Sequence, residues 1–223
     1  MYCDFDDTLP LPTEVENEFS DKAGDNLNAL TWLSDHGVES TRKDVALIQY
    51  GMIWSPETGR YQFLIYQPGH VGPKHPAELA IPIIEDGTFI DLLFISEEMT
   101  FARATCRAPW LGREYLALPV VRLHAHPMDW LKAGCTGVCH IEPISRRAFK
   151  ELRTVETIEC NDIYTALEAW DWGFDADRAN DDAQQDLARF VIDDTSFNIR
   201  RYFEDEARWQ VRSDRFVELV LRA

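Results

Sequence analysis

Between residues 45 and 107, apolar residues gather in short runs that are rich in strand-forming side chains. The segments between these runs, such as 55–59 and 85–87, have the composition of tight turns. The pattern predicts an antiparallel β-meander of about five strands, over Val45–Trp54, Tyr61–Tyr66, Leu79–Ile84, Phe89–Ile95 and Phe101–Arg107.

From residue 119 onward the pattern changes, and short strand-like runs alternate with helical ones. Such alternation favours a small parallel or mixed sheet. The expected strands are Val120–His124, Gly137–Ile141 and Val155–Cys160. The expected helices are Pro127–Ala133, Ser145–Arg153, a helix capped by Asn161-Asp162 that continues through Leu167 and Trp170, and then Gln185–Ile192, Phe197–Trp209 and Phe216–Leu221.

Helical signals also occur near the start of the chain. Leu9-Pro10-Leu11-Pro12 interrupts regular structure, and Thr13–Glu16 then has the acidic residues of a helix start. A helix with apolar residues at 27, 30, 32 and 33 is expected to end at His36-Gly37, where the glycine provides a cap.

These elements predict an α+β fold, with the β-meander followed by the strand–helix half and C-terminal helices. At 223 residues, we expect a single domain over 1–223, with possible sub-units at 38–118 and 119–223. A chain of this size can bury a sizeable core without disulfide bonds.

The sequence has five cysteines, an odd number, and no secretory signal follows Met1. We therefore expect free thiols and a cytoplasmic protein. The longest apolar runs are far shorter than the roughly 20 residues that a membrane-spanning helix needs, so no membrane association is expected.

The net charge of −17 is unevenly distributed. Residues 1–26 carry eight acidic residues against one basic, and residues 151–186 carry eleven against two, whereas the rest of the chain is nearly neutral. This charge disfavours direct nucleic-acid binding and favours basic protein partners or metal cations, although solubility alone also explains it. The candidate partner-binding residues are Asp175, Asp177, Asp181 and Asp182, with the aromatic pair Trp170 and Trp172 at a helix end.

The segment from His124 to His140 concentrates three histidines and two cysteines in 17 residues. His124 and His126 alternate on a strand and so project from one face. A zinc or other divalent-metal site of His124, His126, Cys135 and either Cys139 or a carboxylate is therefore geometrically possible. The alternative is two strand-end histidines beside buried thiols, because free cysteine is a frequent core residue.

The run Ala80–Gly87, followed by Trp110-Leu111-Gly112 and Asp129–Cys135, resembles uncharacterised phage- or prophage-type bacterial proteins. The resemblance implies no activity. The phosphate-binding glycine loops and the nucleophile elbow of hydrolases are absent from the sequence, so those enzyme classes find no support.

Our leading hypothesis is a non-enzymatic accessory or regulatory protein that acts by macromolecular binding, with a basic protein as partner. The alternative is a metal-dependent hydrolase of phosphate esters, with the His124–His140 segment as the metal site and Glu142 as general base. The sequence leaves the oligomeric state open.

Overall fold

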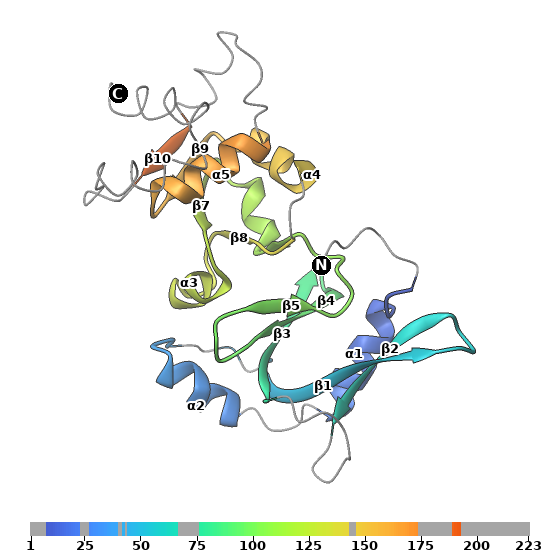
Figure 1. Cartoon of the computed structure of the whole chain (residues 1–223). Helices are drawn as coiled ribbons and strands as arrows, with labels where there is room; N and C mark the ends of the chain where they lie inside the picture. Colours follow the sequence, from blue (N-terminus) through green and yellow to red (C-terminus); the bar gives the residue numbers. More distant parts are fainter. Residues whose placement is uncertain are drawn as a thin grey trace, which may run out of the picture. The chain divides into compact units, whose positions relative to one another are not determined.

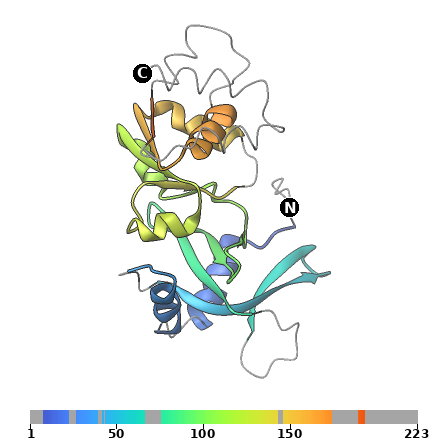
Figure 2. The same cartoon turned by 60° about the vertical axis from the view of Figure 1, so that its left-hand side comes forward.

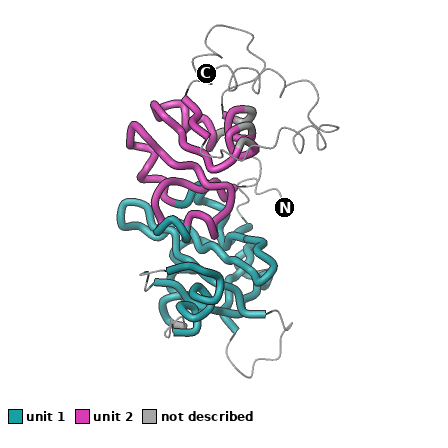
Figure 3. The backbone as a smooth tube through the Cα atoms, turned by 90° about the vertical axis from the view of Figure 1, so that its left-hand side faces the viewer, with its two compact units in different colours: residues 1–111, 131–134 teal, residues 112–130, 135–223 magenta. Residues whose placement is uncertain are grey.

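A computed structural model describes residues 8–22, 27–39, 42, 44–66, 76–142, 146–173 and 189–192. The chain forms two compact units, one of residues 1–111 with 131–134 and one of residues 112–130 with 135–223 (Figure 3). The first holds a five-stranded antiparallel sheet, and the second holds a sheet with parallel pairings, so the α+β class is confirmed. The single-domain organisation, with possible sub-units at 38–118 and 119–223, stays a prediction.

Two helices precede the first sheet, α1 (Pro12–Lys22) and α2 (Leu27–Asp35). The Glu14 carboxylate accepts a hydrogen bond from the backbone N–H of Leu11 at 3.0 Å, which caps the start of α1. At the end of α2, Gly37 has φ +73° and donates to Ser34 O, while Val38 N donates to Leu33 O. This Schellman motif confirms the expected glycine cap.

The sheet of the first unit has five antiparallel strands in the order β2-β1-β3-β4-β5. Their order differs from their order along the chain, because β3 pairs with β1 while β2 lies at the edge. The strands are β1 (Ala46–Ser55), β2 (Arg60–Tyr66), β3 (Glu78–Glu85), β4 (Thr88–Ile95) and β5 (Phe101–Arg103), and β6 (Trp110–Leu111) follows along the chain.

The β1–β2 hairpin is only partly supported by the rest of its sheet. Within the described residues, β3 pairs with β1 at Ala46–Ile48, whereas β1 pairs with β2 from Gln49 to Ser55. The distal part of the hairpin is therefore a two-stranded ribbon, which extends away from the other strands (Figures 1 and 2).

One face of this sheet packs against α1. Tyr50 and Phe94 stack with ring centroids 3.8 Å apart, and Phe63 lies against both rings. Val15 of α1 is fully buried among these side chains. The aromatic cluster and Val15 thus fix α1 on the inner part of the hairpin.

Asp91 of β4 organises the loop after β5. Its carboxylate is fully buried and accepts four backbone N–H bonds of 2.8–3.3 Å, from Leu92, Thr105, Arg107 and Ala108. A buried carboxylate is tolerated here because these four donors satisfy it.

Cys106 lies within this loop at φ +54° and is disulfide-bonded. The free cysteines are Cys135, Cys139 and Cys160, and the remaining cysteine, Cys3, lies outside the described residues. The expectation of free thiols throughout is therefore wrong for Cys106.

In the second unit, β10, β9, β7 and β8 lie side by side in this order with parallel pairings. Helical segments connect successive strands, which confirms the expected strand–helix alternation. The elements are η1 (Arg113–Ala117), β7 (Val120–His124), α3 (Pro127–Lys132), β8 (Val138–His140), α4 (Arg146–Phe149), η2 (Lys150–Thr154), β9 (Thr157–Cys160), α5 (Ile163–Gly173) and β10 (Phe190–Ile192).

The second sheet follows the strand alternation closely. Val121 and Leu123 of β7 are buried, whereas Val120 is exposed and Arg122 is half-buried beside Glu159 of β9. α5 contacts β9 and β10, and its start is capped by the carboxylate of Asp162, which accepts from Thr165 N at 2.9 Å. This contact confirms the expected cap.

The expected helix Gln185–Ile192 is wrong at its end, because Phe190–Ile192 forms β10 and pairs in parallel with β9. Short apolar runs fit a buried strand and a helix face equally well. Here the segment forms a strand because it pairs with the edge of β9. The expected helices Phe197–Trp209 and Phe216–Leu221 lie outside the described residues. In the described part of the chain, no helix is long and apolar enough to cross a membrane.

Candidate functional site

The histidine–cysteine segment runs from the end of β7 through α3 into β8. His124 closes β7 and is only 3% exposed. Its Nε2 donates a hydrogen bond to Thr136 O at 2.9 Å, since a carbonyl oxygen can only accept. Nδ1 then carries a lone pair, which is buried and has no hydrogen-bond partner among the described residues.

The surroundings of His124 favour the neutral ring. Burial lowers its pKa below the usual 6.5, and the charge of Arg122 acts in the same direction. The hydrogen bond to Thr136 and the charge of Asp129 oppose this shift without reversing it. His124 is therefore an uncharged core residue near neutral pH.

His126 caps helix α3. Its Nδ1 accepts the backbone N–H of Met128 at 3.1 Å, and its carbonyl oxygen accepts the N–H groups of Asp129 and Trp130. Side-chain acceptors at this position satisfy the free N–H groups of a first helical turn. The ring nitrogen nearest the helix is thus already used by the fold.

The two cysteines of the segment also have structural roles. Cys135 follows α3 at φ +61°, and its N–H donates to Trp130 O at 2.9 Å. Cys139 is the register partner of His124 across β7 and β8, and it is fully buried. Burial raises the pKa of the Cys139 thiol and the charge of Asp129 raises it further, so this thiol stays protonated.

The four expected ligands do not form a metal site. Within the ranges that the structure describes, no three His, Cys, Asp or Glu side chains come together in a group that could hold a metal ion. A ring nitrogen of His126 caps the start of α3, whereas Cys135 caps its end only through the backbone N–H. His124 and Cys139 are core positions of adjacent strands. These residues are close in sequence, but the side chains of His124, His126 and Cys139 have structural roles in the β-α-β connection.

Glu142, the expected general base, is half-buried two residues beyond β8. It belongs to no metal-binding group in the described part of the chain. Glu142 thus shares with the metal sites of open sheets its position after a strand, but not a set of neighbouring ligands.

The expected partner-binding residues divide into two sets. Asp175, Asp177, Asp181 and Asp182 lie outside the described residues, as does the side chain of Trp172. Trp170 is only 7% exposed on α5, so it does not present the exposed aromatic surface that we expected.

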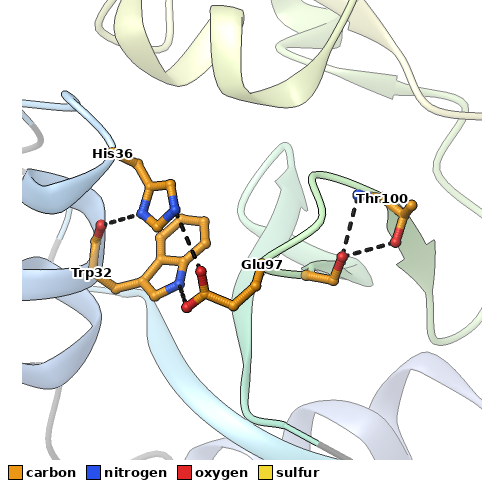
Figure 4. Close-up of polar contacts among 5 residues, drawn as sticks. Trp32, His36, Glu97 and Thr100 are labelled. Carbon is orange, nitrogen blue, oxygen red and sulfur yellow. Dashed lines mark hydrogen bonds and ion pairs between the residues drawn. The ribbon is translucent and has the colours of Figure 1, made fainter.

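A polar cluster that sequence reasoning missed joins α2 to the turn between β4 and β5 (Figure 4). Trp32 Nε1 donates to Glu97 Oε1 at 2.8 Å, and the His36 ring stacks on Trp32 with centroids 3.8 Å apart. His36 Nδ1 donates to Trp32 O at 2.7 Å, while its Nε2 lies 3.6 Å from Glu97 Oε2. The spacing of four residues between Trp32 and His36 was the available signal, because it places both on one helix face.

This cluster is a clamp between two elements of the first unit. The turn itself is closed by the Ser96 hydroxyl, which lies 2.8 Å from the Thr100 hydroxyl and accepts from Thr100 N. Trp32 is buried, and the Glu97 side chain that binds it is 55% exposed. The contacts therefore anchor α2 through its buried tryptophan.

Among the described residues of the first unit, the two most exposed aromatic side chains lie on the β1–β2 ribbon, and Phe101 of β5 follows at 38%. Trp54 and Tyr61 are register partners, 45% and 39% exposed, and their rings meet edge to face at 5.2 Å. We call this pair the aromatic tip. The adjacent Ile53, on the opposite face of the ribbon, is 46% exposed.

No protein-family model matches the chain, and neither the curated proteins nor the solved structures contain a match to it. The resemblance to phage-type proteins therefore stays a prediction. The function must be inferred from the geometry of the chain itself.

Proposed function

We propose that this chain is an accessory or regulatory protein that acts by binding another protein, and that the aromatic tip is its contact surface. The observation that carries the proposal is the exposed pair Trp54–Tyr61 on a two-stranded ribbon. We further propose a basic protein as the partner class. The cytoplasmic location stays a prediction, because the free thiols on which it rested do not include Cys106.

Single exposed apolar residues are ordinary, but a group of them on a projecting element is informative. The aromatic face of the ribbon begins in the core at Tyr50 and Phe63 under α1, and it continues outward to the aromatic tip. Trp and Tyr dominate the binding energy of protein interfaces, because they bury a large area and keep a polar atom. A partner that covers the tip would extend the apolar core outward along the ribbon.

Hydrogen bonds from the first unit to the backbone of β2 keep the ribbon in place and do not use the aromatic side chains of the tip. Tyr61 N donates to Thr8 O at 2.6 Å, and Ile65 N donates to Glu18 Oε1 at 3.0 Å. Both ends of edge strand β2 are therefore held by α1 and the residues before it. A preorganised surface loses little conformational entropy on binding.

The test compares the chain with a Trp54→Ala/Tyr61→Ala variant in pull-downs from a lysate of the organism that encodes it. The control is Tyr164→Ala, which removes a 46% exposed tyrosine from α5 in the second unit. We expect a partner that the wild type and the control capture and that the double variant loses. Equal capture by all three proteins would refute the aromatic tip as the contact surface.

The geometry of the described residues does not favour the metal-dependent hydrolase alternative. The side chains of His124 and His126 have separate structural roles, and the part of the chain that the structure describes offers no group of metal ligands.

A further inference from the structure

The surroundings of the aromatic tip define the chemistry of its partner. We infer that the tip and the outer face of α1 together bind a basic amphipathic segment of another protein, with apolar residues on Trp54 and Tyr61 and Lys or Arg residues on the acidic side chains of α1. This inference rests on the proposed function and adds the partner class and a second contact element.

α1 runs along the edge strand of the ribbon, with its N-terminal end toward the tip. Thr8, four residues before α1, bonds the backbone of Tyr61, whereas Glu18 in the second half of α1 bonds that of Ile65. Figures 1 and 2 both show α1 beside β2. The first turns of α1 therefore lie nearest to Tyr61.

The outer face of α1 is acidic. Val15 points into the core, while Glu14, Glu16 and Asp21 are exposed; the one basic residue of the helix is Lys22, at its last position and at the end away from the tip. Glu14 also caps the helix, so its presence has a local explanation. Glu16 and Asp21 lie beyond the first turn and have no such role.

The charge on the ribbon does not cancel this acidic face. Its turn carries the exposed Glu57, and its one basic residue, Arg60, is half-buried at the start of β2. A cationic side chain of the partner can therefore reach the acids of α1, and it can also lie over the aromatic faces of Trp54 and Tyr61. The same charge repels phosphate groups, which argues against nucleic acid or an anionic membrane as the occupant.

The probe for this inference is a fluorescein-labelled amphipathic helix of leucine and lysine, with a leucine–glutamate peptide of equal length as its counterpart. Fluorescence anisotropy measures the affinity of each peptide for the full chain at low and at physiological salt. We expect the wild type to bind the lysine peptide and to leave the glutamate peptide unbound.

Two variants separate the contributions. Trp54→Ala/Tyr61→Ala should weaken binding of the lysine peptide by about tenfold or more. Glu14→Gln/Glu16→Gln should weaken it about three- to tenfold at low salt and reduce its salt dependence. The matched control is Glu114→Gln/Glu156→Gln, which removes two exposed acids from the second unit and should bind as the wild type does.

Several outcomes would overturn the inference. These are equal affinity for both peptides, no binding to the wild type, or an effect of the Glu114/Glu156 control as large as that of the α1 variant. None of them decides the proposed function, which stands or falls with the pull-down by the tip variant. A dimer in sedimentation velocity that the Trp54/Tyr61 variant abolishes would assign the surface to a second copy of the chain.

Discussion

The His124–His140 segment and the β1–β2 hairpin differ in how well their residue types predict what is exposed to solvent. The segment is rich in residue types that perform chemistry, yet His124 and Cys139 are buried in the core and a ring nitrogen of His126 caps α3. The hairpin has an ordinary strand sequence, yet it presents a tryptophan and a tyrosine to solvent. The comparison teaches that residue types only suggest where a site could be. A functional site also needs side chains that are accessible and have no structural role.

The largest effect that tests this comparison is expected at Gly137, between α3 and β8. Gly137 has φ +79°, and a Cβ there would collide with the carbonyl oxygen of Arg122. Gly137→Ala should therefore lower the free energy of unfolding by about 2–4 kcal/mol in urea denaturation.

Gly59→Ala is the matched control for Gly137→Ala. Gly59 also has a positive φ, +65°, but no atom lies within 4 Å of its added Cβ. The control should cost about 1 kcal/mol. Equal losses at both positions would mean that the connection around Gly137 is not tightly packed, against its proposed structural role.

The next effect is a pH dependence at His124. Its folded-state pKa lies below 6.5, so the unfolded chain binds more protons as the pH falls through the unfolded value. The folded state therefore loses stability as the pH falls through the unfolded value of 6.5, and this loss levels off below the folded pKa.

His124→Gln isolates the contribution of His124 protonation to the pH dependence of stability, because glutamine can still donate to Thr136 O and does not titrate. The unfolding free energy of the wild type minus that of the variant should decrease from pH 7.5 to 5.5. A difference that is constant or increases over this range would contradict a neutral, buried His124.

A smaller effect is expected at His126. His126→Ala removes the acceptor for Met128 N and should cost about 1 kcal/mol, whereas His126→Asn should restore most of the loss because asparagine is a good N-cap. Thermal and urea unfolding measure both values. A loss in both variants that depends on added zinc would instead indicate a metal ligand.

The smallest effect on stability is expected at the aromatic tip. Trp54 and Tyr61 are about half exposed and contact each other edge to face, so replacing both with alanine should cost less than about 1 kcal/mol. Urea denaturation of the double variant measures this value. A loss of several kcal/mol would mean that the pair is part of the core rather than a surface for a partner.

Much of the fold could be predicted from local patterns. The hairpin turns, the glycine cap at Gly37 and the cap at Asp162 are set by neighbouring residues, and the structure confirms them. The pairing of β3 with β1 and the strand at Phe190–Ile192 depend on partners distant in sequence, which local periodicity does not encode.

The site was harder to predict, because it depends on exposure. Trp170 and Trp54 are both aromatic residues in amphipathic segments, but packing buries the first and leaves the second in solvent. His124 and Cys139 could be placed on adjacent strands from sequence, but their burial could not. The carboxylate of Asp91 gave no signal either, since its four donors come from a loop that its own contacts shape.

The most direct test is the amount of partner captured by the Trp54→Ala/Tyr61→Ala variant and by His126→Ala, each relative to the wild type. We predict that the tip variant keeps its stability and loses the partner, while His126→Ala loses stability and keeps the partner at temperatures where it is folded. Capture that survives loss of the aromatic tip but is lost with His126 would contradict the assignment of function to the hairpin.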